Sequence, residues 1–174
     1  MKIAVLGYAA CGKSTLAKFL AQKYGAPILY LDAVQFQANW QERSREEAVH
    51  MAASFLERES WVIDGNYRAF LQEERLRQAD QIILMLFPRF TCLFRALRRY
   101  RTFRNKTRES MADGCMEKMD WGFVWWILHR GRTGGARAHY RDILRAYGEK
   151  TTVLRSQKQL DQFYDTLSKE PDTA

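Results

Sequence analysis

A glycine-rich segment near the start of the chain has the residue types and spacing of a phosphate-binding loop. Residues 7–14 read GYAACGKS, which matches the pattern G-x-x-x-x-G-K-[ST] in full. In such a loop, glycines let backbone N–H groups turn inward, and a lysine neutralises the charge of the β- and γ-phosphates. Seven residues here are therefore predicted to bind ATP: Gly7, Ala10, Cys11, Gly12, Lys13, Ser14 and Thr15. Lys13 is also predicted to act on the transferred phosphoryl group.

The sequence on both sides of this segment supports the same prediction. Lys2 to Leu6 form a short apolar run that is typical of a buried strand. A helical pattern then begins at Lys13 and continues to about Tyr24. A strand, a glycine loop and a helix in this order direct the positive end of the helix dipole at the bound phosphates.

Two aspartates follow apolar strands and are candidates for the chemistry of phosphoryl transfer, which needs a magnesium ion and an aligned acceptor. Asp64 ends the run WVID, and Asp32 ends the run ILYLD. We predict that Ser14 and Asp64 hold Mg²⁺, with Asp64 acting through water, and that Asp32 binds or deprotonates an acceptor hydroxyl. The alternative is that either aspartate only caps the end of its strand.

The elements that must position these residues alternate between strands and helices. Strands are expected at residues 2–6, 28–31, 61–63, 81–87 and 151–154, and helices at about 13–24, 44–58, 70–78, 90–104, 121–146 and 157–168. Short apolar strands between helices predict an α/β fold with three layers, in which helices cover both faces of a five-stranded parallel sheet. Ligands bind at the carboxyl ends of such strands, so Gly7, Asp32 and Asp64 should share one edge. Residues 1–174 are predicted to form a single domain.

The positive charge of the chain is concentrated in one segment. The chain has 28 Lys and Arg against 20 Asp and Glu, and residues 88–140, with 12 basic and 4 acidic side chains, hold the whole excess. Arg95 and Arg99 lie one helical turn apart in this segment, and we predict that they stabilise the charge of a transferred phosphoryl group. The same arginines are alternatively a solvated basic face, or a surface for nucleic acid.

Aromatic residues are also frequent in and near this segment. Trp121, Phe123, Trp125 and Trp126 recur with helical spacing, which favours core packing over a platform for stacked bases. Trp40 follows Asp32 in a stretch without regular structure and is the better candidate for stacking on a ligand.

These motifs together resemble the bacterial DNA topology modulation proteins, which are P-loop proteins similar in fold to adenylate and shikimate kinases. The resemblance rests on GYAACGKST, LYLDAVQFQANW, WVIDGNYR, ILMLFPR and MADGCMEKMDW, and it extends over about residues 2–165. It implies a sheet of nucleoside-monophosphate-kinase type, ATP bound at the loop and an arginine-bearing lid, which corresponds here to a lid-like segment at about 90–137. Arg132, in a glycine-containing group with its neighbouring arginines, is a candidate for the returning edge of that lid. Asp64 and Gly65 are similar to the aspartate-glycine pair of adenylate kinases. Leu86 departs from the resemblance, because an acid is expected there as a second magnesium contact.

Composition excludes several classes of protein. Apolar residues make up 47% of the chain and there are only 3 prolines, as in a folded domain and unlike a disordered or collagenous one. The longest apolar runs fall far short of a membrane-spanning helix, so no membrane partner is expected. Three cysteines without metal-ligand spacing fit a reducing cytoplasm.

Three functions remain open at this point. The first is an ATP-dependent kinase that phosphorylates a small acceptor, either a nucleotide or another hydroxyl compound. The second is a DNA-binding or topology-modulating protein that uses ATP as a switch without kinase turnover. The third is a nucleotide-binding regulator with no chemistry of its own.

Overall fold

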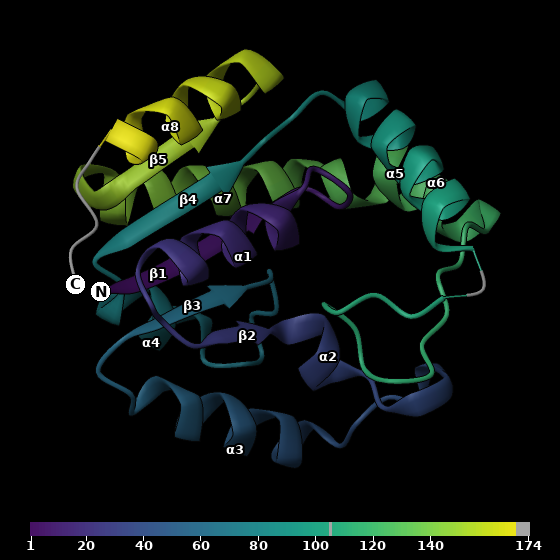
Figure 1. The fold of residues 1–174 in the computed structure, drawn as a ribbon, viewed down its shortest axis with the longest axis horizontal. Coiled ribbons are helices and arrows are strands. Elements are labelled where there is room, and N and C mark those ends of the chain that lie inside the picture. Colours follow the sequence, from purple (N-terminus) through teal and green to yellow (C-terminus); the bar gives the residue numbers. More distant parts are fainter. Residues whose placement is uncertain (105, 170–174) are drawn as a thin grey trace.

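The computed structural model of the protein describes residues 1–104 and 106–169 (Figure 1). Its centre is a five-stranded sheet in which every strand pair is parallel and the strand order is β2-β3-β1-β4-β5. The strands are β1 (Lys2–Gly7), β2 (Ile28–Tyr30), β3 (Trp61–Asp64), β4 (Gln81–Met85) and β5 (Thr151–Leu154). The predicted five-stranded parallel sheet of an α/β fold is therefore confirmed.

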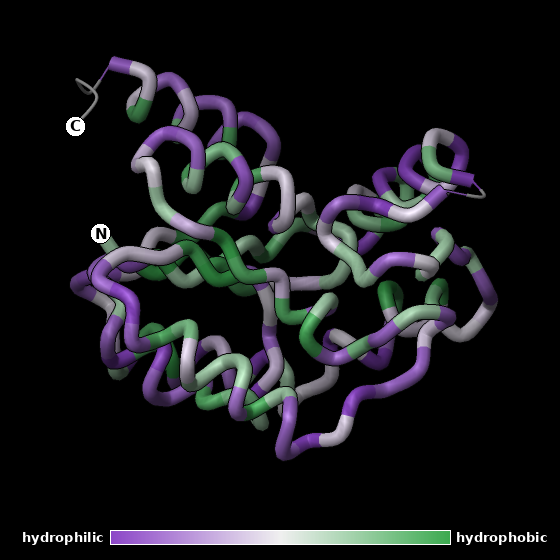
Figure 2. The backbone as a smooth tube through the Cα atoms, turned by 60° about the horizontal axis from the view of Figure 1, so that its bottom comes forward, coloured by the Kyte–Doolittle hydropathy of each residue, from purple (hydrophilic) through white to green (hydrophobic). Residues whose placement is uncertain are grey.

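Two hydrophobic cores cover the two faces of this sheet. Alternate side chains of a strand point to opposite faces, and β1 shows this directly. Ile3 and Val5 belong to one core, whereas Ala4 and Leu6 belong to the other. Figure 2 shows the hydrophobic strands at the centre, with polar segments outside them. This arrangement is that of three layers, with helices on both sides of the sheet.

The described residues form eight α-helices, which divide between these two cores. The first core receives buried side chains from α1 (Lys13–Lys23), α5 (Arg89–Phe103), α6 (Trp121–Leu128) and α8 (Gln157–Lys169). The second receives them from α2 (Leu31–Gln35), α3 (Arg45–Leu56), α4 (Gln72–Gln78) and α7 (Gly134–Tyr147). Short 3₁₀ helices lie at Ala38–Trp40, Arg130–Arg132 and Gly148–Lys150. In Figure 1, α5 and α6 lie side by side beyond the carboxyl ends of the strands.

Capping residues begin helices where the sequence predicted, but the prediction of one long helix at residues 121–146 was wrong. The hydroxyl of Ser44 caps α3 by accepting a hydrogen bond from the N–H of Glu47 at 3.2 Å. The single helix predicted at 121–146 is instead α6, a 3₁₀ turn and α7. Glycines at 131, 134 and 135 interrupt the helix, and Thr133 caps the new one by accepting from the N–H of Ala136.

The strand β2 is shorter than predicted. It ends at Tyr30, and Leu31 already belongs to α2. Asp32 therefore lies in the first turn of a short helix rather than directly at a strand end. The sequence missed this helix because five residues are too few for a 3.6-residue period to show.

No helix within residues 1–104 and 106–169 is both long and apolar enough to span a membrane. The three cysteines, Cys11, Cys92 and Cys115, are buried free thiols.

Candidate functional site

The predicted phosphate-binding segment joins β1 to α1 in a conformation that requires glycine at two positions. Gly7 has φ +143°, and a Cβ atom there would lie 2.1 Å from the carbonyl oxygen of Met85. Gly12 has φ +98°, and a Cβ atom there would lie 3.0 Å from Nη1 of Arg95. Backbone of this kind is accessible to glycine and strained for other residues. The segment is thus tightly folded against β4 and α5.

Lys13 points back over this loop. Its Nζ donates a hydrogen bond to the carbonyl oxygen of Tyr8 at 3.0 Å. Burial alone would lower the pKa of the Lys13 ammonium, but the nearby acidic groups, Asp64 among them, outweigh burial, so the pKa lies above its usual value. Lys13 therefore stays positively charged inside the loop. Cys11 is fully buried, and burial raises the pKa of its thiol to about 11, so this side chain is neutral.

Ser14, in the first turn of α1, and Asp64, at the end of β3, lie next to each other. The hydroxyl of Ser14 donates to Oδ2 of Asp64 at 2.6 Å. Asp64 is only 5% exposed, and its other oxygen, Oδ1, is buried without a hydrogen-bond partner among the described residues. Burial raises the pKa of the Asp64 carboxyl to about 6, although Lys13 and the Ser14 hydroxyl oppose the rise.

The side chains of Ser14 and Asp64 suit magnesium better than a metal that is coordinated only by protein groups. Within the described part of the chain, no group of three or more His, Cys, Asp or Glu side chains converges as a metal site. Mg²⁺ is usually held by one or two carboxylates together with phosphate oxygens and waters, and a metal-bound water would satisfy the unpaired Oδ1 of Asp64. Ser14 and Asp64 are therefore suited to such an ion. The side chain of Leu86 has no oxygen atom and packs against the hydrophobic core, so it does not supply a second magnesium ligand.

The loop after β3 joins the predicted site residues to one another. The side-chain amide of Asn66 donates to the carbonyl oxygen of Gly7 at 2.6 Å and accepts from the N–H of Gly7 at 3.0 Å. The hydroxyl of Tyr67 donates to Oδ1 of Asp32 at 2.9 Å. Sequence analysis missed both Asn66 and Tyr67, although both stand directly after Asp64 and Gly65. Their pairing with residues far away in the chain has no signal in the sequence.

A buried arginine of α4 supports this loop from behind. Arg75 has no exposed surface, and its guanidinium donates to the carbonyl oxygens of Gly65, Tyr67 and Phe70 at 3.3, 2.7 and 2.9 Å. Burial lowers the pKa of Arg75 to about 10, so it remains charged at neutral pH. The loop that carries Asn66 and Tyr67 is therefore held at three points.

Asp32 lies at the edge of the site rather than within it. The residue is exposed, and Tyr67 is its hydrogen-bond partner. Burial, and then the nearby Asp32 carboxylate, raise the pKa of the Tyr67 hydroxyl above its usual range. Tyr67 thus stays protonated and fixes the position of the Asp32 carboxylate.

The two predicted lid arginines are both engaged within the protein. Arg95 donates to the carbonyl oxygen of Cys11 and to Oε1 of Gln157, and its guanidinium lies 4.4 Å from the centre of the Phe87 ring. Arg99 is paired with Glu117. Arg95 therefore contacts the loop directly, whereas Arg99 belongs to a separate network.

Arg132 is a further contact of the loop. Its guanidinium lies 3.8 Å from the centre of the Tyr8 ring and donates to the sulfur of Cys92 at 3.2 Å. Sequence analysis placed Arg132 only in a group at the edge of the lid. The contact arises because the turn after α6 returns the chain to the start of α5.

The predicted core packing of the tryptophans in α6 was wrong. Trp121, Trp125 and Trp126 are 87%, 55% and 47% exposed, and only Phe123 packs partly against the core. The periodicity identified the helix correctly but did not show which of its faces is covered. Trp40 donates from Nε1 to the carbonyl oxygen of Met116 at 3.0 Å, so its polar atom already has a partner.

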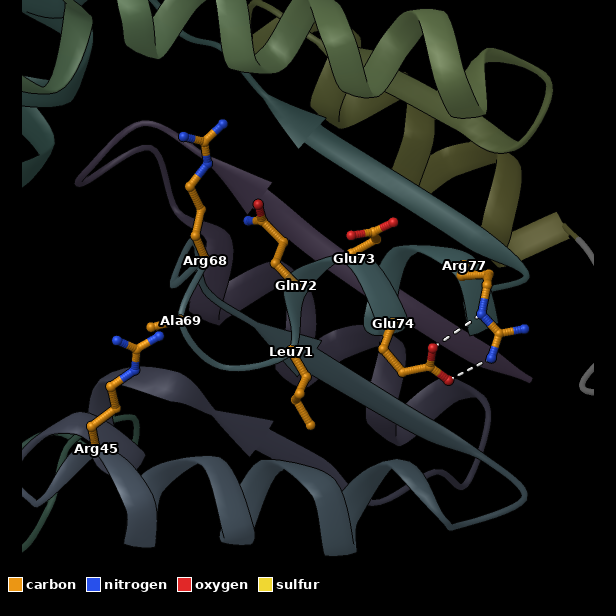
Figure 3. Close-up of a pocket in the computed structure, with 8 residues that line it drawn as sticks. All are labelled: Arg45, Arg68, Ala69, Leu71, Gln72, Glu73, Glu74 and Arg77. Carbon is orange, nitrogen blue, oxygen red and sulfur yellow. Dashed lines mark hydrogen bonds and ion pairs between the residues drawn. The ribbon is translucent and has the colours of Figure 1, made fainter.

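A surface hollow of about 430 Å³ lies elsewhere, around α4 (Figure 3). It is lined by Arg45, Arg68, Ala69, Leu71, Gln72, Glu73, Glu74 and Arg77. None of the predicted site residues lines it, and Arg77 is already paired with Glu74 at 2.6 Å. We assign it no role in the site.

Comparison with known proteins identifies no family. No family model matches the chain, and no curated protein matches it either. Among solved structures, an uncharacterized protein from Eubacterium ventriosum ATCC 27560 is similar over 98% of this chain and 100% of its own, with 16% identity and a TM-score of 0.49. No argument about fold or function rests on that likeness, so the resemblance to DNA topology modulation proteins stays a prediction.

Proposed function

We propose that the protein is a P-loop phosphotransferase that moves the γ-phosphate of ATP to a small acceptor. The observation that carries the proposal is the meeting of Ser14 and Asp64 beside the partly buried Lys13, with one Asp64 oxygen unpaired. A carboxylate that only capped a strand would have its buried oxygens satisfied, because unpaired buried oxygens destabilise a fold. The arrangement is instead what a site for Mg-ATP requires.

Each residue of the loop has a physical role in this proposal. The glycines and the first turn of α1 supply backbone N–H groups for phosphate oxygens, and Lys13 supplies a fixed positive charge. Ser14 and Asp64 would hold Mg²⁺, which neutralises charge between the β- and γ-phosphates when it is bound. Arg95 and Arg99 would add positive charge from α5.

The acceptor side of the proposed site is the Asp32 carboxylate. Its exposure leaves it open to a small molecule, and the hydrogen bond from Tyr67 fixes its direction. Asp32 would accept a hydrogen bond from the acceptor hydroxyl and take its proton during transfer. The resemblance to the kinase-like family agrees with this assignment, and ATP as substrate together with free thiols would suit the cytoplasm.

Thermal unfolding with Mg-ATP tests the proposal. Binding to the native state alone stabilises it by about 2.7 kcal/mol when the ligand is at a hundredfold excess over Kd. Lys13→Ala should lose most of that shift. Lys158→Ala, an exposed lysine of α8, is the matched control and should keep it. Equal responses of wild type and Lys13→Ala would show that the loop does not bind ATP.

A second candidate function is an ATP-switched DNA-binding protein, and one observation favours it. Arg101 and Arg104 are exposed, form no ion pair with any described residue, and lie on or next to a helix pair that also exposes Trp121. Binding that neutralises several phosphates weakens with a slope of about −0.9 per phosphate in log K against log salt. We expect affinity for duplex DNA at physiological salt in the non-specific range of about 10⁻⁴–10⁻⁶ M. Submicromolar, sequence-selective binding that depends on Arg101 and Arg104 would favour this second function.

A further inference from the structure

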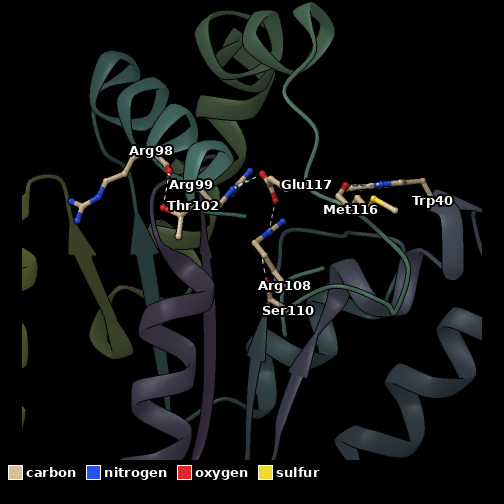
Figure 4. A network of polar contacts seen from close by, with 8 residues as sticks. All are labelled: Trp40, Arg98, Arg99, Thr102, Arg108, Ser110, Met116 and Glu117. Carbon is tan, nitrogen blue, oxygen red and sulfur yellow. Dashed lines mark hydrogen bonds and ion pairs between the residues drawn. The ribbon is translucent and has the colours of Figure 1, made fainter. Parts of the chain in front are cut away.

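A buried carboxylate joins two arginines above the sheet edge (Figure 4). The side chain of Glu117 is 3% exposed. Its Oε1 accepts a hydrogen bond from Nε of Arg99 at 2.7 Å, and its Oε2 accepts one from Nε of Arg108. Arg99 belongs to α5, whereas Arg108 and Glu117 belong to the connection between α5 and α6. One carboxylate thus holds side chains from two separate segments.

The pairing leaves the outer nitrogens of both guanidinium groups available. Glu117 occupies only the Nε positions, and Nη1 of Arg108 donates to the hydroxyl of Ser110 at 3.1 Å. The described residues supply no hydrogen-bond acceptor for Nη1 and Nη2 of Arg99 or for Nη2 of Arg108. The two arginine side chains are only 25% and 15% exposed. None of these nitrogens is among the buried atoms that lack a partner in the described residues, so they reach solvent and are open to a ligand. A planar guanidinium fits a phosphoryl group well.

The segment that carries Glu117 is anchored on both sides of the site. Isolated bridges pair Arg104 with Glu117 and Thr107 with Met116. At the far end, the sulfur of Cys115 contacts the carbonyl oxygen of Gln37 at 3.1 Å, next to the bond from Trp40 to Met116. The connection therefore runs from α5 to the 3₁₀ helix after α2, across the side of the molecule that holds Asp32.

The charges of this cluster act on the proposed site. The positive charge of Arg108 lowers the pKa of Asp64 and so partly offsets the effect of burial. The shared Glu117 carboxylate holds the two guanidinium groups close together. Burial, and then the neighbouring charge of Arg108, lower the pKa of Arg99. The positive charges of Arg99 and Arg108 repel each other unless negative charge lies between them.

We propose that Glu117 is a positioning residue that joins Arg99 and Arg108 into one binding site for a phosphoryl group. The proposal rests on the proposed function, because it assigns these residues to the same site. The Glu117 carboxylate offsets one of the two positive charges, and the remaining charge and the outer nitrogens face the ligand. That ligand is either the γ-phosphate of ATP or a phosphate on the acceptor, since both present the same oxygens.

Calorimetric titration with inorganic phosphate at constant ionic strength tests the proposal without ATP. We expect Arg99→Ala and Arg108→Ala each to weaken phosphate binding by about tenfold or more, as for the loss of a charge-assisted contact. Glu117→Gln keeps the shape but removes the charge, and should weaken binding about fivefold or more. Arg98→Ala and Asp113→Asn, which change exposed neighbours, should bind phosphate like wild type.

Several results would overturn the proposal. One is a wild type that does not bind phosphate, and another is a folded Glu117→Gln protein with unchanged affinity, which would make Glu117 a purely structural ion-pair partner. If Glu117→Gln does not fold, Arg99→Lys replaces it, because lysine keeps the charge but lacks the Nε contact. Arg99→Lys should weaken phosphate binding, and unchanged affinity would contradict the proposal. In an Arg99→Ala protein, Glu117→Gln should reduce phosphate affinity less than it does in the wild-type protein, because Glu117 acts through the arginines.

A second titration identifies the source of the phosphoryl group. If a non-hydrolysable ATP analogue with Mg²⁺ blocks phosphate binding, the site takes the γ-phosphate. If phosphate still binds to the saturated protein, the site takes a phosphate on the acceptor. The Lys13→Ala response to Mg-ATP remains a separate test, so failure of the kinase proposal and failure of the Glu117 proposal are distinguishable.

Discussion

At the carboxyl ends of β1 and β3, polar side chains are buried or half-buried and make hydrogen bonds within the protein, whereas on α5 and α6 large apolar side chains face solvent. Asn66 is bonded twice to Gly7, and Ser14 is bonded to Asp64. Eight of the ten exposed large apolar side chains of the described residues lie between Phe90 and Trp126. The first region is fixed by its own contacts, and the second presents side chains that have little to contact inside the protein.

This difference shows where each region is expected to respond to substitution. Buried polar networks lose both stability and geometry when one partner changes. Exposed side chains change stability little, and their substitution matters only when a ligand or partner contacts them. This contrast predicts large effects for substitutions in the first region and small effects for those on the exposed face of the second.

The largest expected effect is the loss of phosphoryl transfer in Asp64→Asn. Magnesium stabilises the charge of the transition state by several kcal/mol, so without it the rate of phosphoryl transfer should fall by about a hundredfold or more. Steady-state assays with a panel of small hydroxyl acceptors measure this effect. Asp32→Asn is the informative comparison, because it should damage transfer and spare ATP binding. Full activity of Asp32→Asn with every accepted substrate would remove Asp32 from the site.

The next effect concerns stability and pH. The pKa of Asp64 is about 6 in the folded protein and 3.8 in an ordinary aspartate, so between these values the native state binds more protons than the unfolded state. The free energy of unfolding should therefore fall as pH rises from about 4 to about 6. Asp64→Asn should abolish this fall in the free energy of unfolding. It should therefore stabilise the ligand-free protein at pH 7.5 by roughly 1–3 kcal/mol.

Chemical denaturation of both proteins at pH 4.5 and pH 7.5 measures this difference. Asp165→Asn, an exposed residue of α8, is the control and should leave the profile unchanged. A difference between wild type and Asp64→Asn that is the same at both pH values would show that the Asp64 pKa is not raised.

A smaller effect is expected where the two regions touch. Arg95 extends from α5 to the carbonyl oxygen of Cys11, so Arg95→Ala should reduce phosphoryl transfer by about tenfold or more. Arg98→Ala removes a neighbouring exposed arginine from the same helix and should leave transfer unchanged. Equal rates for all three proteins would place Arg95 outside the catalytic site.

The smallest effect is expected on the exposed helix face. Trp121→Ser should change the free energy of unfolding by less than about 0.5 kcal/mol, because Trp121 is 87% exposed. Trp61→Ala provides the contrast, since Trp61 is fully buried and its loss should cost about 3–5 kcal/mol. A large cost for Trp121→Ser in denaturant unfolding would mean that this face of α6 is covered in solution.

The sequence alone determined the features that depend on short-range patterns. The apolar runs and their turn residues predicted the five parallel strands, and the pattern around Lys13 predicted a loop between β1 and α1. The strand-end rule brought Gly7 and Asp64 to one edge, as the parallel register shows. These patterns are local because a strand and a helix differ in the spacing of their apolar residues.

Only the tertiary structure decided which side chains meet across long distances in the chain. The bonds from Asn66 to Gly7 and the pairing of Glu117 with Arg99 join segments whose separation no periodicity encodes. The same is true of α6, where spacing predicted a helix but not that Trp121 would face solvent. Burial depends on what packs against a face, and that is set by the whole fold rather than by the segment itself.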